Sequence, residues 1–307
     1  MIALTLASAL AASTITAPGP NGPLEGTFID AGKGAPIVLI VPGSGPTDRD
    51  GNNPLGVTAA PYRMLAEALA GNGVSSVRID KRGMFGSKGA IPDANKVTIA
   101  DYAADVHNWA KVIRQRTESK CVWVAGHSEG GVVALAAGQD KSDLCGIVAI
   151  SAMGRKFGTV LREQLRANPA NAPILSAAEK AIDELEAGRD VPTTSLPPVL
   201  MGLFNPAVQP FLKDLMAHDS AALAASLKLP LLILSGDLDI QTPVADAKAL
   251  AAAQPTAKLV IANGVNHVLK SPDGTDRAAN LATYGDPARP ISPAIVNAVA
   301  GFVKAKR

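Results

Sequence analysis

The segment that decides the fold of this chain covers residues 121–130 and reads CVWVA followed by GHSEG. The apolar residues 121–125 predict a buried strand, and the Ala- and Val-rich residues 131–138 predict a helix after it. The Gly-x-Ser-x-Gly pattern between them is informative because it joins a strand to a helix through a tight turn. Such a turn holds Ser128 at positive φ with its Oγ exposed, and side chains at Gly126 and Gly130 would collide there. We therefore predict Ser128 as a nucleophile, with the backbone amide of Glu129 at the helix N-terminus as an oxyanion donor.

The composition fits one α/β domain with an insertion. Hydrophobic residues make up 47% of the 307 residues, which argues against disorder. The 29 Lys and Arg residues balance 27 Asp and Glu residues and gather in no basic stripe. We therefore predict no nucleic-acid partner and no anionic-membrane surface. Nothing in the sequence indicates an oligomeric state.

The first twelve residues, MIALTLASALAA, are apolar but too short to span a bilayer as a helix, so we predict no stable membrane span. Ala9-Leu10-Ala11 is typical of a signal-peptidase site, although no Lys or Arg precedes the apolar stretch. Residues 1–12 are therefore either the remnant of a signal peptide or an N-terminal strand. We expect an exported protein, periplasmic or secreted, with a cytoplasmic location as the alternative.

The two cysteines bear on the same question. Cys121 opens the strand that leads to Ser128, and Cys145 opens the next predicted strand, at residues 146–151. Consecutive strands of such a sheet usually lie side by side, about 4.8 Å apart, so the two cysteines can meet disulfide geometry. The alternative is a pair of small buried hydrophobic side chains. A bond between them would support an oxidising compartment.

The rest of the chain alternates strand-like and helix-like segments, which predicts a mostly parallel sheet flanked by helices. Predicted strands lie at residues 14–17, 25–30, 37–41, 74–80, 121–125, 146–151, 229–235 and 258–262, the first two as an antiparallel hairpin. Predicted helices lie at residues 61–70, 98–116, 131–138, 244–253 and 293–304. Residues 152–228 break this rhythm with short helices and no clear strand. We therefore expect an α/β core at residues 13–151 and 229–307, with a helical cap at residues 152–228 inserted into it.

A serine nucleophile needs a base to take its proton, and the chain offers four histidines. His127 lies inside the turn, where its side chain should point away from Ser128. His107 lies on a helix and His218 in the predicted cap. Only His267 follows a late strand, at the carboxyl edge where open α/β sheets build their sites. We therefore predict His267 as the base.

The acid that orients this base should lie between the serine and the histidine in the chain. Residues 236–243, GDLDIQTP, follow the strand at 229–235 and carry two carboxylates, Asp237 and Asp239. Both fall in the right loop, and their positions alone do not separate them.

The order Ser128, then Asp237 or Asp239, then His267 resembles the α/β-hydrolase family, from about residue 24 to the C-terminus. The acid loop of that family usually reads Gly-x-x-Asp-x-x-x-Pro, and residues 236–243 match it with Asp239 at the acid position. The resemblance therefore implies Asp239 as the acid and leaves Asp237 as the alternative. Residues 80–87, DKRGMFGS, resemble the family's Asp-x-Arg-Gly-x-Gly-x-Ser turn with one extra residue. In the family, that turn supports the wall of the site and does no chemistry.

The loop at residues 42–52, PGSGPTDRDGN, is similar to a subgroup of bacterial serine esterases, the EstD-like carboxylesterases. By position in that family, the amide of Ser44 joins that of Glu129 in the oxyanion hole. The motif does not assign Asp48, Arg49 and Asp50, which either brace the loop through an ion pair or contact the substrate.

These features together predict a serine carboxylesterase that hydrolyses short- to medium-chain esters, with a small-molecule ester as its partner and no cofactor. Serine peptidase, thioesterase, lactonase, perhydrolase and acyltransferase activities remain alternatives on the same fold. A non-catalytic binding protein is a further alternative, because fold does not imply function. We predict no metal site, because the few Cys and His residues are not at zinc-binding spacing.

Overall fold

The computed structural model describes residues 12–305 of the chain. Residues 1–11, predicted as part of a signal-peptide remnant or an N-terminal strand, lie outside the described residues. Ala12 is the first residue of strand β1.

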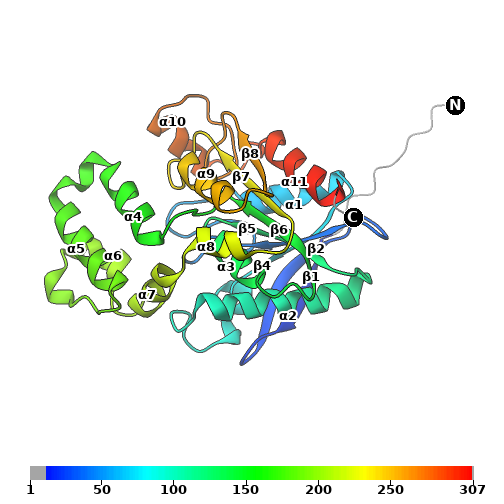
Figure 1. Ribbon diagram of the computed structural model, residues 1–307, viewed down its shortest axis with the longest axis horizontal. Helices are drawn as coiled ribbons and strands as arrows, with labels where there is room; N and C mark the ends of the chain where they lie inside the picture. The colour runs from blue at the N-terminus through cyan, green and yellow to red at the C-terminus, as the bar shows by residue number, and fades with distance from the viewer. Residues whose placement is uncertain (1–11, 306–307) are drawn as a thin grey trace.

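The core is a sheet whose eight strands run in the order β1-β2-β4-β3-β5-β6-β7-β8 (Figure 1). β1 pairs antiparallel with β2, and β2 with β4, whereas the other neighbours pair parallel. This confirms the predicted mostly parallel sheet and its opening hairpin. The strands are Ala12–Pro18 (β1), Pro23–Ile29 (β2), Ile37–Val41 (β3), Ser75–Ile79 (β4), Val122–His127 (β5), Leu144–Ile150 (β6), Leu231–Gly236 (β7) and Lys258–Ala262 (β8).

Helices cover both faces of the sheet, because side chains of a strand point alternately to opposite sides. Leu39 of β3 belongs to a core cluster with α2, α3, α8 and α9, whereas its neighbour Ile40 packs with α1 and α11. All five residues of β3 are buried, as expected for a central parallel strand. The α-helices of the core are Pro61–Gly71 (α1), Ile99–Thr117 (α2), Glu129–Ala137 (α3), Ser220–Ser226 (α8), Val244–Ala253 (α9), Arg277–Ala282 (α10) and Pro293–Ala305 (α11), and 3-10 turns lie at Phe85–Ala90 (η1) and Thr283–Gly285 (η5).

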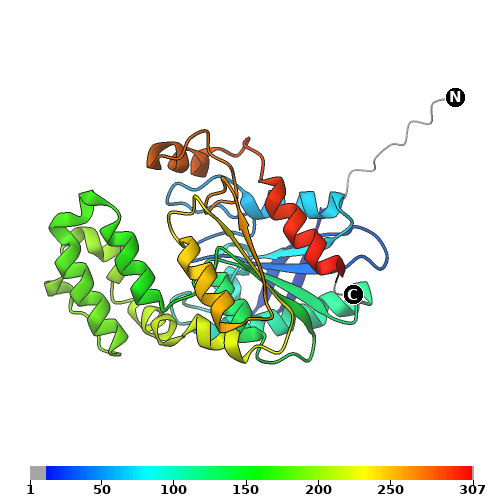
Figure 2. The same ribbon diagram turned by 45° about the horizontal axis from the view of Figure 1, so that its top comes forward.

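Residues 152–228 contain only helices and loops. Helices α4 to α7 stand to one side of the sheet, at the left of Figures 1 and 2. They enclose an apolar cluster of their own around Ile182, Leu200 and Phe204. Helix α8, by contrast, packs against α3 and α9 in the main core. The body that stands away from the sheet is thus shorter than the predicted insertion, and it consists of Phe157–Arg166 (α4), Pro169–Ile174 (η2), Leu175–Glu186 (α5), Thr193–Ser195 (η3), Pro198–Leu200 (η4), Met201–Phe204 (α6) and Gln209–Ala217 (α7).

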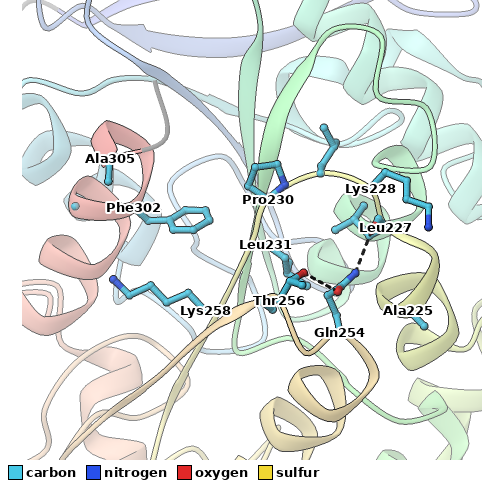
Figure 3. Close-up of a pocket in the computed structure, with 13 residues that line it drawn as sticks. Ala225, Leu227, Lys228, Pro230, Leu231, Gln254, Thr256, Lys258, Phe302 and Ala305 are labelled. Atoms are coloured by element: carbon cyan, nitrogen blue, oxygen red, sulfur yellow. Dashed lines mark hydrogen bonds between the residues drawn. The ribbon is translucent and has the colours of Figure 1, made fainter.

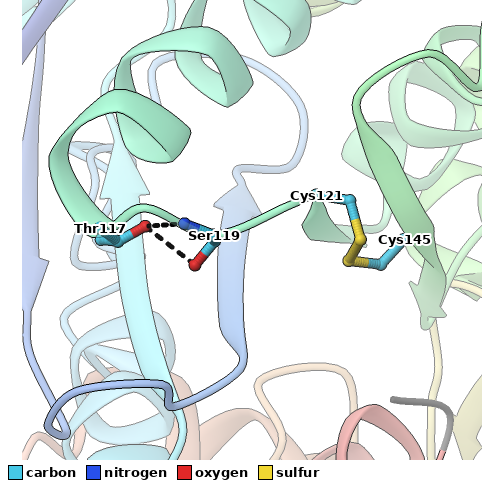
Figure 4. Close-up of a disulfide and its surroundings, with 4 residues drawn as sticks. All are labelled: Thr117, Ser119, Cys121 and Cys145. Atoms are coloured by element: carbon cyan, nitrogen blue, oxygen red, sulfur yellow. Dashed lines mark hydrogen bonds between the residues drawn. A yellow bond between two sulfur atoms is a disulfide. The ribbon is translucent and has the colours of Figure 1, made fainter.

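A disulfide joins Cys121 to Cys145, with their Cα atoms 5.1 Å apart (Figure 4). It links the beginnings of the neighbouring strands β5 and β6. Beside it, a 2.9 Å hydrogen bond between the hydroxyls of Thr117 and Ser119 holds the end of α2. Since Ser128 follows the last residue of β5, the disulfide lies at the opposite edge of the sheet from the predicted nucleophile.

None of the helices within residues 12–305 combines the length and the apolar character that a membrane span requires.

Candidate active site

The predicted site residues come together because their strands end at one edge of the sheet. The β3 residue Val41 pairs with Gly126 of β5, so the loop after β3 lies beside the turn that carries Ser128. β7 pairs with β8, and the loops after these two strands carry Asp239 and His267. The parallel register therefore brings four loops to one place, where open α/β sheets form their ligand crevices.

The turn at Ser128 has the strained geometry that its sequence predicts. Ser128 lies between β5 and α3 with φ 55° and ψ −121°, a conformation that non-glycine residues rarely adopt. A Cβ on Gly130 would lie 2.5 Å from the carbonyl oxygen of Val41, and one on Gly126 would overlap the Gly130 carbonyl. Both positions thus require glycine, and the surrounding sheet holds the serine in its strained conformation.

His267 and Asp239 form a buried pair. His267 Nδ1 lies 2.8 Å from Asp239 Oδ2, and both side chains are almost fully shielded from solvent. The other carboxylate oxygen, Oδ1, accepts the backbone N–H groups of Gln241 and Thr242 at 2.8 and 2.9 Å. Because the carboxylate accepts at Nδ1, the imidazole carries its proton there and keeps Nε2 free to accept another.

The environment of Asp239 keeps it ionised. Burial alone would raise the pKa of this carboxyl, but the charge of His267 and the hydrogen bonds from His267, Thr242 and Gln241 outweigh burial and lower it. Asp237 has a different role in the loop, since its Oδ1 accepts the N–H of Gly264 at 2.6 Å. The structure thus brings Asp239, and not Asp237, to the histidine.

Ser128 and His267 line one cavity of about 140 Å³. Among the described residues, no hydrogen bond joins Ser128 Oγ to the imidazole. Ser44 lines the same cavity, and Glu129 begins α3 directly after the serine. Within residues 12–305, neither the Ser44 nor the Glu129 amide N–H has a hydrogen-bond acceptor, so both are available to an anion.

His127 and Tyr62, to which sequence reasoning gave no role, connect three of these loops. His127 Nε2 donates to the carbonyl oxygen of His267 at 2.9 Å, so its Nδ1 must accept the Tyr62 hydroxyl, 2.8 Å away. The Tyr62 oxygen in turn accepts the N–H of Gly43 at 3.1 Å. Burial, with a smaller effect of the nearby His267 charge, lowers the pKa of His127 to about 3, so this imidazole stays neutral.

The acidic and basic residues of the loop after β3 brace it. The Arg49 guanidinium donates to Asp80 at 2.9 Å, and Asp50 accepts from Arg78 at 2.8 Å. Asp48 accepts the backbone N–H groups of Asp50 and residue 52 within the loop. Of the two interpretations left open by the sequence, these contacts favour bracing for all three residues.

A second cavity, of about 230 Å³, lies between the core and the cap. Ser44 lines both cavities, and Glu129 also borders the second. The walls of the second cavity are largely apolar and come from both sides, with Val97 and Tyr102 from the core and Phe211, Leu203 and Leu215 from the cap.

A larger hollow, of about 880 Å³, lies away from this edge, where β7 and β8 begin (Figure 3). Pro230, Gln254, Lys258 and Phe302 are among its lining residues, which include no Ser, His, Asp or Glu. Its lining residues therefore offer no serine, histidine and carboxylate set of the kind found at the sheet edge. Within residues 12–305, no group of three or more His, Cys, Asp or Glu side chains is placed to hold a metal ion.

Comparisons with known proteins found a matching family model, an esterase relative and solved structures of similar fold. A family model described as serine aminopeptidase, S33, matches residues 55–196. Esterase EstD from Thermotoga maritima is 26% identical over 268 residues, which cover 85% of this chain and 58% of that protein. The chain thus spans less than two thirds of the length of this relative.

Solved structures match over nearly the whole chain. GrgF, an α/β hydrolase from Penicillium sp. sh18, superposes with a TM-score of 0.62 at 20% identity, covering 97% of this chain and 99% of its own. The esterase Pf2001 from Pyrococcus furiosus superposes with a TM-score of 0.60 at 17% identity, covering 96% of this chain and 91% of its own. Likeness at this level of identity concerns the fold alone, so these matches show that the chain has the α/β-hydrolase fold.

Proposed function

We propose that the protein is a serine carboxylesterase that hydrolyses short- to medium-chain esters through an acyl-enzyme on Ser128. The observation that carries this proposal is the buried Asp239–His267 pair, which opens onto the same cavity as Ser128. The likeness to an esterase over 85% of the chain supports ester rather than other acyl substrates.

In the proposed reaction, Ser128 Oγ attacks the ester carbonyl while His267 Nε2 takes its proton. Asp239 holds the proton on Nδ1 and stabilises the imidazolium that forms. The imidazolium then gives its proton to the leaving alcohol, and an acyl-enzyme remains. A water molecule that His267 deprotonates attacks this acyl group and releases the carboxylic acid, which restores the serine.

The negative charge of each tetrahedral intermediate falls on the former carbonyl oxygen. We assign the amides of Ser44 and Glu129 as its donors, because neither N–H group has an acceptor within residues 12–305. Ser44 also lines the cavity of Ser128, and Glu129 directly follows the serine. Loss of one such donor typically costs about a hundredfold to a thousandfold in kcat.

The acyl group is assigned to the apolar cavity between core and cap. This cavity of about 230 Å³ meets the serine cavity at Ser44. It is smaller than the ~300–1,000 Å³ of pockets for drug-sized ligands, so a short or medium acyl chain suits it better than a long one.

A serine peptidase is the second candidate, because the matching family model is described as an aminopeptidase. An enzyme that binds a free α-amino group needs an unpaired carboxylate to receive the ammonium. Among the described residues that line the two cavities, the only carboxylate is Glu129, and it is already paired with Lys81 at 3.0 Å. This arrangement favours a neutral ester over a peptide N-terminus.

We also propose that the protein works in an oxidising compartment, the periplasm or outside the cell. The Cys121–Cys145 bond supports this location, since disulfides persist mainly in such compartments.

The experiment is hydrolysis of p-nitrophenyl esters from acetate to palmitate by the wild type and by Ser128→Ala. We expect activity that falls beyond medium chains and is lost in the variant. If a folded wild type hydrolyses none of these esters, the carboxylesterase proposal is wrong, and amide, thioester and lactone substrates should then be tested. Activity that survives in Ser128→Ala would show that another residue is the nucleophile.

A further inference from the structure

Lys81 lies behind the candidate oxyanion hole. Its Nζ donates to the carbonyl oxygen of Gly43 at 2.7 Å and pairs with Glu129 Oε1 at 3.0 Å. The side chains of Lys81 and Glu129 are only 3% and 2% exposed. Nζ also lies 5.3 Å from the centre of the Tyr102 ring. One buried ammonium therefore contacts both segments that carry the candidate oxyanion donors.

The contact with Gly43 determines the direction of the Ser44 amide. The carbonyl of Gly43 and the N–H of Ser44 belong to one peptide group, which is planar and trans, so the two point in opposite directions. A donor that holds the Gly43 oxygen on the Lys81 side therefore turns the Ser44 N–H away from Lys81. Ser44 lines both the cavity of Ser128 and the cavity that Lys81 borders, and in this proposal the N–H turned away from Lys81 faces the cavity of Ser128.

The second contact acts on the other donor. Glu129 supplies its backbone N–H at the start of α3, while its carboxylate is held by Lys81. The ammonium thus fixes the position of the Glu129 residue relative to the Gly43–Ser44 peptide. It also polarises that peptide, because a hydrogen bond to a carbonyl strengthens the N–H of the same group as a donor.

We propose that Lys81 is a positioning residue for the oxyanion hole, which sets the distance and direction between the Ser44 and Glu129 amides. This inference rests on the proposed function. It gives a role to a residue of the 80–87 turn beyond support of the wall. Lys81 itself does not touch the reacting atoms in this scheme, and its effect reaches them through the two amides.

A purely structural role for the buried ion pair is the alternative to be tested. Lys81→Met removes the charge and the donor but leaves Glu129 as an unpaired buried carboxylate, which destabilises the fold. Lys81→Met/Glu129→Leu removes both charges, and exchange of a buried pair for apolar side chains is often tolerated. Both variants keep every backbone amide, so they differ in stability while sharing the loss of the contact to Gly43.

Arg82→Met provides a matched control. Arg82 is also buried and ion-paired, with Asp105 at 2.7 Å and Asp101 at 3.0 Å, and it contacts neither Gly43 nor Glu129. We expect it to lower the melting temperature without changing kcat of the folded enzyme.

The measurements are kcat and KM for one p-nitrophenyl ester, the melting temperature, and the Ki of a trifluoromethyl ketone. Such a ketone adds Ser128 Oγ to its carbonyl and leaves an oxyanion in the hole. We expect Lys81→Met and the double variant to lose about 10- to 100-fold in kcat. The Ki of the ketone should rise by the same factor in both. KM is not diagnostic here, because Lys81 and Glu129 both line the cavity assigned to the acyl group.

Recovery of wild-type kcat in the double variant, or an unchanged Ki in either, would show that the pair is only structural and would overturn the proposal. A wild type without any esterase activity would instead overturn the proposed function itself. The two failures are therefore distinguishable.

Discussion

Asp239→Asn replaces one carboxylate oxygen of the histidine partner by an amide nitrogen. The hydrogen bonds around the residue decide which one. Oδ1 accepts two backbone N–H groups, from Gln241 and Thr242, so an NH₂ group cannot occupy that position without facing two donors. The NH₂ must therefore take the place of Oδ2, opposite His267 Nδ1.

There the amide donates to Nδ1 and forces the imidazole proton onto Nε2, the atom that must accept the proton of Ser128. The hydroxyl of Thr242 lies 2.9 Å from Oδ2 of Asp239 and 2.9 Å from the carbonyl oxygen of Ser151. In the variant, this hydroxyl can accept a hydrogen bond from the new amide while it donates its own to Ser151. Each of these buried groups, the imidazole included, thus keeps a hydrogen-bond partner. The substitution should act on the tautomer and not on the stability of the fold.

We expect kcat to fall about 10⁴-fold, since the wrong tautomer of a catalytic histidine costs this much. In activation free energy this corresponds to about 5 kcal/mol. The free energy of unfolding should change by only about 1 kcal/mol.

The assay is hydrolysis of p-nitrophenyl butyrate, with urea unfolding of the same samples. Asp237→Asn is the matched control, because Asp237 is bound to Gly264 and has no contact with His267. It should keep nearly all of the activity. A loss of less than tenfold in Asp239→Asn, or a larger loss in Asp237→Asn, would refute the choice of Asp239 as the acid.

Three further predictions concern stability and specificity. The residues of the Cys121–Cys145 disulfide lie 24 positions apart, so its reduction should lower the free energy of unfolding by about 3 kcal/mol. The melting temperature should fall while kcat stays the same. An unchanged melting temperature in a sample whose two thiols can both be titrated would contradict this. His127 has a pKa lowered from 6.5 to about 3 in the folded state, so the unfolded chain binds the proton first and stability should fall as the pH drops from 6.5 to 3. Urea unfolding should show a steeper fall in the wild type than in His127→Gln, and equal slopes would be evidence against a buried neutral imidazole. Leu203→Trp should fill the apolar cavity and lower kcat/KM for hexanoate far more than for acetate, whereas an equal effect on both esters would exclude this cavity as the acyl site.

Much of the fold can be predicted from local pattern. The buried parallel strands are continuous apolar runs, and glycines flank Ser128 because the turn leaves no room for a Cβ. The cap was harder to delimit. Helix α8 looks like the other short helices in sequence, and only its contacts with α3 and α9 assign it to the core.

Chain order was enough to predict some residues of the candidate site. The residues whose role depends on contacts between distant segments could not be predicted in this way. Ser128 and His267 follow strands, so their position at the carboxyl edge can be read from the sequence. Asp237 and Asp239 are two residues apart in one loop, and the strand period that fixes side-chain direction does not extend into a loop. The geometry that separates them exists only once β7 and β8 are paired.

Lys81, Tyr62 and His127 illustrate the same limit. Tyr62 and His127 are 65 positions apart, and Lys81 meets Gly43 only because β4 lies beside β3 in the sheet. The sequence did contain one indication that Lys81 belongs to the site. This lysine follows a predicted strand at the carboxyl edge of the sheet, where the predicted site residues also lie. A lysine there is usually solvated, and its burial was not readable from the sequence.

The sharpest test of Ser128 as a nucleophile served by His267 is mass spectrometry of the protein after reaction with a fluorophosphonate. We predict one adduct per chain, mapped to the peptide that contains Ser128, absent in Ser128→Ala and formed far more slowly in His267→Ala. An adduct on another residue, or labelling of Ser128 at the same rate without His267, would contradict the proposed mechanism.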